Sequence, residues 1–305
     1  MKNLIFTLLI WIALSSISHA KQLAITFDDA PRSANGYMDG QTRAKTLIEN
    51  LKKYHIGQVA FFSNSRALND EGMKRMQLYD NAGHLIANHT HSHPNFLETN
   101  LANYHEDFLQ AHRLLKEFHN FAPYFRFPYL REGETLEKRD GMREALSKYG
   151  YKNAYITLNN YDWYIEDLFQ KALREGKEVD LQRLSHMYVD VLMQSISYYD
   201  NLAIKHLGRS PKHVLLLHEM DISALFIGDL IEQLRGEGWE IISMEEAYQD
   251  PIAKYETEKP LKYNPGKIGE IALGKGQRKG LWHYTLDESY LEQRFEQEVL
   301  LLSEN

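Results

Sequence analysis

Short apolar segments alternate with helical segments along most of this chain, and this alternation is the strongest constraint on its fold. The segments with the length and content of buried strands are 22–27, 58–62, 84–88, 124–127, 153–157, 214–217 and 239–243. Those with helical spacing between them include 42–54, 70–82, 100–118, 136–148 and 222–234. Such alternation is typical of a parallel sheet with helical crossovers. Seven units in about 230 residues favour an α/β fold, a distorted (β/α)7 barrel, over an open doubly wound sheet.

Two regions depart from this rhythm. Residues 165–208 have helical patterning in two pieces divided near Gly176, and we interpret them as a helical insertion in the barrel. Residues 251–280 are rich in Lys, Glu, Gly and Pro, which predicts a polar tail or a wrapping loop. A terminal helix is expected over 287–302, with Asp287 as its N-cap. The barrel is therefore expected over 21–250 and a polar C-terminal extension over 251–305.

The first twenty residues have the pattern of a secretory signal peptide. Lys2 precedes an apolar run over 4–14, and Ser18 and Ala20 are the small residues expected at positions −3 and −1 of a cleavage site after Ala20. The alternative is an uncleaved anchor, but the run is shorter than the roughly 20 residues of a spanning helix. We expect an exported protein, periplasmic or secreted, with no stable membrane anchor after cleavage.

Composition excludes several kinds of chemistry. The 305 residues contain no cysteine, so disulfides, thiolate nucleophiles and cysteine-ligated metals are ruled out, and any metal must bind His, Asp or Glu. A net charge of −7 argues against general binding to nucleic acid, which requires clustered Lys and Arg. Nothing in the sequence indicates an obligate protein partner.

Two of the expected strands end in groups suited to metal binding and proton transfer. Asp28 and Asp29 end the first strand, where one carboxylate could bind a cation and the other accept a proton, although Asp-Asp before proline is also ordinary turn chemistry. After the third strand, His89 and His93 would share a face if the chain were helical, whereas an extended chain would also align His91 with them. Two of these histidines with one aspartate would form a metal site with an open position for water.

Three later strands also end in polar or aromatic side chains. Arg126 could pair with a carboxylate of the site, or it could be a surface residue on an edge strand. His218 directly follows a buried apolar run and is suited to acid–base chemistry near neutral pH. Asp162 could orient His218 or raise its pKa. Trp163, taken alone, indicates core packing more than contact with a substrate.

The ordered set TFDDAP, HTHSHP, RFPY, NNYDW and LLLH resembles the polysaccharide deacetylases, carbohydrate esterase family 4 or the NodB-homology fold, over roughly residues 22–248. This resemblance implies a distorted seven-stranded β/α barrel that removes acetyl groups from glycans with one divalent metal, for which we expect Zn²⁺. It assigns Asp29, His89 and His93 as metal ligands.

The resemblance also implies roles in catalysis. Asp28 matches the general base, held by Arg126, and His218 matches the general acid, with Asp162 as its partner.

The remaining motif positions would contact the substrate. Tyr129 falls where a backbone N–H binds the oxyanion, and Trp163 and Leu216 match the walls of the acetyl pocket. The departures from the family pattern, at Ala30, Phe127, Leu130 and Asn159, fall on the groove walls.

The sequence thus predicts an N-deacetylase whose partner is an N-acetylated glycan: peptidoglycan, a chitin oligomer or poly-N-acetylglucosamine. Two alternatives stay open. One is a hydrolase of a small amide or cyclic imide on the same barrel, which a deep closed pocket would favour. The other is a catalytically silent glycan-binding protein.

Overall fold

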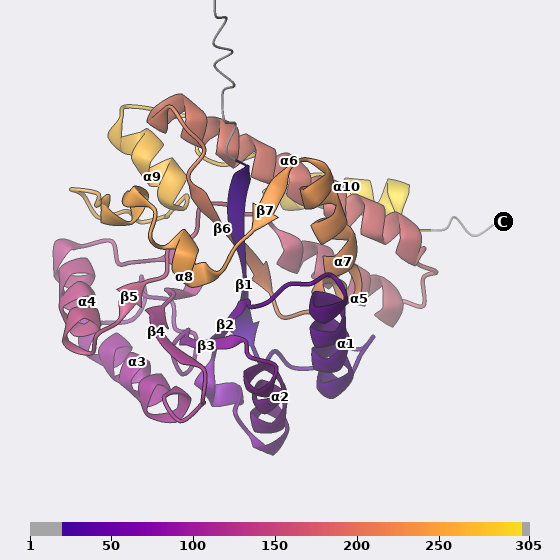
Figure 1. Cartoon of the computed structure of the whole chain (residues 1–305), viewed down its shortest axis with the longest axis horizontal. Helices are drawn as coiled ribbons and strands as arrows, with labels where there is room; N and C mark the ends of the chain where they lie inside the picture. The colour runs from indigo at the N-terminus through magenta and orange to yellow at the C-terminus, as the bar shows by residue number, and fades with distance from the viewer. Residues whose placement is uncertain (1–19, 301–305) are drawn as a thin grey trace, which may run out of the picture.

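A sheet of seven parallel strands forms the centre of the computed structural model, which describes residues 20–300 (Figure 1). The strands are β1 (Lys21–Ala30), β2 (Ala60–Ser63), β3 (Leu85–Asn88), β4 (Phe121–Phe125), β5 (Lys152–Asn153), β6 (Lys212–His218) and β7 (Trp239–Ile241). Their order is β5-β4-β3-β2-β1-β6, and β7 pairs with the start of β1. The predicted barrel class is confirmed. The expected signal peptide over 1–20 lies outside the described residues, apart from Ala20.

Helices surround the sheet between its strands. They are α1 (Gly40–Lys53), α2 (Asp70–Asn81), α3 (Leu101–Leu115), α4 (Leu136–Lys148), α5 (Asp162–Arg174), α6 (Leu181–Leu207), α7 (Asp221–Gly236), α8 (Met244–Ala247), α9 (Lys267–Gly274) and α10 (Glu288–Glu298), with 3₁₀ turns at Ser65–Ala67, Pro128–Leu130 and Pro251–Lys254. In Figure 1, α1 and α7 cover one side of the sheet and α3 and α4 lie at the other end. None of the described helices is long and apolar enough to cross a membrane.

The two faces of the sheet are buried in different ways. Leu23, Ile25 and Phe27 of β1 belong to the large core that also includes the surrounding helices. The alternate residue Ala24 belongs to a smaller cluster of mostly small side chains inside the curled sheet. Successive side chains of a strand point to opposite faces, so Asp28 follows Ala24 toward the interior. The small residues there leave room for polar groups inside the barrel.

The barrel closes through the segment that follows β5. The sequence predicts a strand over 153–157, but only Lys152–Asn153 pair with β4. The chain then changes partner: Leu158 forms a parallel bridge with Leu215, and the Leu216 amide donates to the Leu158 carbonyl at 3.2 Å. The predicted strand is therefore divided between two neighbours, and this change of partner joins β4 to β6.

The two irregular regions both pack against the barrel. The helical patterning over 165–208 is confirmed by α5 and α6, and α6 ends at Gly208 in the left-handed conformation. Within the C-terminal extension, α9 was not expected from the sequence, and it buries Ile268 and Ile271 in the main core. The expected N-cap is confirmed: the Asp287 carboxylate accepts the amide of Tyr290 at the start of α10.

Candidate metal centre and active site

A cavity of about 620 Å³ lies at the carboxyl ends of the strands, where β/α barrels place their chemistry. The predicted site residues that line it are Asp28, Asp29, His89, His93, Tyr129, Trp163, Leu216 and His218. Arg126 and Asp162, the other two, are buried directly behind Asp28 and His218, with which they form hydrogen bonds. All ten residues that the sequence singles out are thus brought together.

Asp28 and Asp29 both reach this cavity because the strand geometry breaks between them. Asp29 has a left-handed backbone with φ of 66°, and the pairing of β1 with β2 shifts register between Phe27 and Ala30. In a regular strand the two side chains would point to opposite faces. Here Asp28 turns to Arg126 while Asp29 accepts a hydrogen bond from Asn64 at 2.8 Å and faces the histidines.

Asp29, His89 and His93 form the cluster best suited to a metal ion. Their ligand atoms all lie within 4.8 Å of one another. Asp29 Oδ1 lies 3.7 Å from His89 Nε2 and 3.4 Å from His93 Nε2. Ligand atoms of a tetrahedral site with bonds of about 2.1 Å stand about 3.4 Å apart, so the three residues fit a divalent ion such as Zn²⁺.

The protonation of these groups also suits a metal. Burial lowers the pKa of both His89 and His93 to about 4, so both rings are neutral at pH 7. His89 Nδ1 lies 2.7 Å from the Arg126 carbonyl, which can only accept, so this nitrogen carries the proton and Nε2 is free to bind a metal. Burial acts to raise the pKa of Asp29, but the positive charges of His218 and Arg32 help to outweigh it, so the pKa is lowered and the carboxylate is ionised.

The histidine segment is neither helical nor extended, so both sequence-based conformations are wrong. Thr90 and His93 have left-handed φ values of 71° and 56°. These turns bring the rings of His89 and His93 to a centroid separation of 4.9 Å. His91 points away and bonds to Ser65 at 2.9 Å. The spacing of four residues identifies the correct pair, but a tight loop, not a helical face, is what joins them.

Arg126 is fully buried beside Asp28, and the surface alternative for it is wrong. Its Nη1 donates to Asp28 Oδ1 at 2.8 Å and to the Thr26 hydroxyl at 2.9 Å, and its Nε donates to the Ala154 carbonyl at 2.9 Å. Its guanidinium also lies 4.1 Å from the ring centroid of Phe62. Burial raises the pKa of Asp28 to about 6, although Arg126 acts in the opposite direction. Asp28 is therefore ionised above about pH 6.

His218 and Asp162 form a second pair across the cavity. His218 Nδ1 lies 2.8 Å from Asp162 Oδ1, and the His218 amide donates to Oδ2 at 2.8 Å. Burial alone would lower the pKa of His218, but the Asp162 carboxylate outweighs it and raises the pKa to about 9. His218 is thus protonated at neutral pH, with its Nε2 free of Asp162.

Comparison with known proteins identifies the first part of the barrel. Residues 16–154 match the sequence model of the polysaccharide deacetylase family. Over these residues the chain is similar to the polysaccharide deacetylases. The match includes Asp28, Asp29, His89, His93 and Arg126, so the family resemblance predicted from the sequence is confirmed. Asp162 and His218 lie beyond it, and their pairing rests on the structure.

Individual proteins that are similar to this chain agree with that match. A peptidoglycan-N-acetylglucosamine deacetylase of Bacillus cereus is 30% identical over 128 residues, which are 42% of this chain and 42% of the relative. The alignment thus spans less than half of that protein. The structure of a peptidoglycan deacetylase from Bacillus subtilis is 18% identical, with a TM-score of 0.51 over 75% of this chain and 92% of that one.

One of the similar structures is catalytically silent. A family 4 carbohydrate esterase pseudoenzyme from Bacillus anthracis is 16% identical, with a TM-score of 0.53 over 75% of this chain and 65% of that one. At these identities the structural similarity shows the fold. Because a pseudoenzyme has the same fold, any argument for activity in this chain must come from its own side chains.

The walls of the cavity contain the predicted substrate residues. Leu216 is buried, and Trp163 packs against Tyr161 with a ring separation of 5.1 Å. Tyr129 has a left-handed backbone with φ of 56°, and its exposed ring meets the edge of His93 at 4.6 Å. The structure thus places all three residues at the wall of the cavity.

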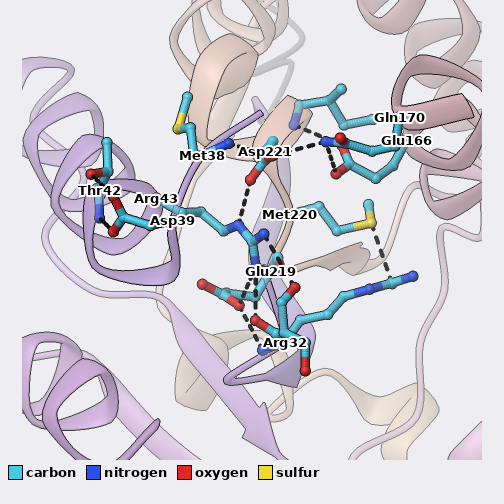
Figure 2. A network of polar contacts seen from close by, with 12 residues as sticks. Arg32, Met38, Asp39, Thr42, Arg43, Glu166, Gln170, Glu219, Met220 and Asp221 are labelled. Atoms are coloured by element: carbon cyan, nitrogen blue, oxygen red, sulfur yellow. Dashed lines mark hydrogen bonds and ion pairs between the residues drawn. The ribbon is translucent and has the colours of Figure 1, made fainter. Parts of the chain in front are cut away.

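The sequence analysis missed a buried ionic network beneath the site, shown in Figure 2. Glu219 follows His218, and its amide donates to the Asp28 carbonyl at 3.0 Å. Its carboxylate accepts from Arg43 at 3.3 Å, from Arg75 at 3.4 Å and from the Arg32 amide at 2.8 Å. Arg43 also bonds to Asp221 at 2.6 Å.

This network fixes the backbone that carries both candidate proton-transfer residues, Asp28 and His218. Its only sequence signal is the pair of acidic residues, Glu219 and Asp221, directly after His218.

Proposed function

We propose that this protein is an exported, metal-dependent hydrolase that removes N-acetyl groups from an amino-sugar glycan, namely peptidoglycan, a chitin oligomer or poly-N-acetylglucosamine. One observation carries the proposal: a cluster of two neutral histidines and the ionised Asp29 lies between a carboxylate held by Arg126 and a cationic histidine held by Asp162. A hydrolysis that needs both a base and an acid uses this combination.

The chain's own groups divide the proton transfers. Asp28 has one oxygen bound to Arg126, while its Oδ2 lies 3.8 Å from His89 Nε2 and faces the metal ligands. It can therefore accept a proton from an attacking water next to the cluster. A divalent ion on Asp29, His89 and His93, for which we propose Zn²⁺, would polarise the acetyl carbonyl and acidify that water.

His218 supplies the second proton. An amine anion is a very poor leaving group, so the sugar nitrogen must be protonated as the C–N bond breaks. With Nδ1 directed to Asp162, the Nε2–H of the imidazolium is the available donor. The Tyr129 main chain and the walls formed by Trp163 and Leu216 would orient the acetyl group. Asp28 is ionised above about pH 6 and His218 is protonated below about pH 9, so both are ready between these values.

Exposed aromatic rings at the cavity, among them Tyr129, favour a glycan over the small amide or imide of the alternative hydrolase. A protein that only binds glycans would not need the two proton-transfer pairs, Asp28 with Arg126 and His218 with Asp162, so their presence argues against the catalytically silent alternative. The signal peptide expected over residues 1–20 supports a substrate in the cell envelope or outside the cell.

The test is acetate release from a panel of N- and O-acetylated glycans, with and without a chelator. We expect release from N-acetylated sugars that the chelator stops and added Zn²⁺ restores. We also expect Asp29→Ala to lose both bound metal and activity, whereas Asp140→Asn, on the exposed side of α4, should keep both. The proposal would be overturned if the metal-free enzyme released acetate. It would also be overturned if no substrate of the panel yielded acetate.

A further inference from the structure

The C-terminal extension forms part of the wall of the same cavity. Tyr263, Asn264 and Trp282 line it together with Asp29 and His218. The side chains of Tyr263 and Trp282 are 55% and 46% exposed, although both are large and aromatic. Rings of this kind are normally buried, and an exposed group of them beside a polar cavity indicates a surface that binds a ligand.

The two rings lie on chain segments that the barrel holds in place. Leu281, just before Trp282, is buried in the main core, and the carbonyl of Gly280 accepts the Tyr198 hydroxyl of α6 at 2.6 Å. On the other side of α9, the amide of Lys267 donates to the Ile156 carbonyl at 2.8 Å. Because these anchors flank the rings, a ligand would meet a preformed surface and lose little affinity to ordering it.

Arg131 connects this wall to the loop after β4. Its guanidinium lies 5.3 Å from the ring centroid of Tyr129 and 5.5 Å from that of Tyr263, and its Nη1 donates to Asn95 at 2.8 Å. Tyr263 is therefore connected, through Arg131, with Tyr129 beside the metal ligand His93, and Trp282 lines the same cavity.

We propose that Trp282 and Tyr263 form an aromatic subsite that binds a sugar ring next to the one whose acetyl group is removed. Pyranose rings present flat C–H faces that stack on aromatic rings, while their hydroxyls suit the polar partners that Arg131 and Asn264 offer. The inference rests on the proposed function, since it places the acetylated sugar at Asp29, His89 and His93. In this proposal, the C-terminal extension recognises the length of the glycan chain.

Acetate release and calorimetric binding test this subsite, with N-acetylglucosamine and its β-1,4- and β-1,6-linked pentamers as probes. We expect Trp282→Ala to weaken pentamer binding and to raise the KM for the preferred pentamer about tenfold, the scale of one lost aromatic anchor. The kcat should not change, and the monosaccharide should be cleaved at an unchanged rate. Trp282→Phe should restore most of the affinity, because it keeps a ring.

Tyr284→Ala is the matched control, since it removes an exposed ring two residues away that does not line the cavity. It should bind and cleave both pentamers as the wild type does. The subsite is overturned if Trp282→Ala affects monosaccharide and pentamer equally, or affects neither, or if the wild type binds neither pentamer. Calorimetry separates this result from failure of the proposed function: a protein that binds a pentamer through Trp282 but releases no acetate would keep the subsite and lose the deacetylase.

Discussion

Replacing Asp162 with asparagine is the sharpest perturbation of the proposed acid. The Asp162 carboxylate accepts the ring N–H and the amide of His218 and the amide of Trp163, each at 2.8 Å. Asparagine offers one oxygen acceptor and one NH₂ donor, so it cannot accept on both sides. The variant therefore removes the negative charge beside His218 and also sets an NH₂ group against a donor.

The expected size of the effect follows from the pKa of His218. Burial lowers this pKa, and the Asp162 carboxylate is the main group that raises it from 6.5 to about 9. Without the carboxylate, the pKa should fall to 6.5 or below. At pH 8 the protonated fraction would then fall from about 0.9 to about 0.03, so a rate that needs the imidazolium should drop about 30-fold. Because the raised pKa favours the charged form, activity is lost as pH rises through it.

The assay is the pH dependence of kcat/KM for acetate release between pH 5 and pH 10. We expect the alkaline limb near pH 9 in the wild type and near pH 6.5 in Asp162→Asn. The control is Asp140→Asn, which removes an exposed carboxylate that pairs with its neighbour Arg139. If the alkaline limb of Asp162→Asn coincides with that of the wild type, His218 does not act as the acid through this pair.

Two further variants test the groups behind the site. Arg126→Met should raise the pKa of the buried Asp28 above about 6, so the acidic limb of the pH profile should move to higher pH. The free energy of unfolding, measured in urea, should fall by about 3–5 kcal/mol because the buried carboxylate loses its partner. An acidic limb that stays in place would contradict this pairing. Glu219→Gln should lower the free energy of unfolding by about 3 kcal/mol, because Arg43 and Arg75 lose a charged partner inside the protein. Equal stability in urea would show that the network does not depend on this charge.

The sequence was sufficient to predict the barrel and which side chains gather at its cavity. The apolar segments give the strands directly, and the polar residues after each of them converge because parallel strands end at one edge. Asp29, His89 and His93 could therefore be identified as one cluster. Their geometry could not, since it depends on left-handed turns at Asp29, Thr90 and His93, and left-handed backbone at such residues is uncommon.

The wall formed by the extension was beyond the reach of sequence reasoning. Its composition is polar, and the short apolar pattern of Ile268 and Ile271 does not reveal which surface buries them. Only that packing brings Tyr263 and Trp282 to the cavity. The prediction of one strand over 153–157 was wrong for a related reason. The segment changes its hydrogen-bonding partner from β4 to β6, and such a change does not alter the hydrophobic pattern of the sequence.

The pairing of Asp28 with His218 across β1 and β6 has a kinetic consequence. The two residues are direct partners in the register, yet their strands lie near opposite ends of the barrel sequence. Closing so long a loop is slow, because chain entropy is lost before the new contacts compensate for it. If the pairing register of β1 with β6 slipped by one residue, one of these two side chains would point to the wrong face of the sheet. After denaturation, recovery of activity should therefore lag behind recovery of helix content. The recovery of activity then reports the pairing of β1 with β6, the last long-range step of folding.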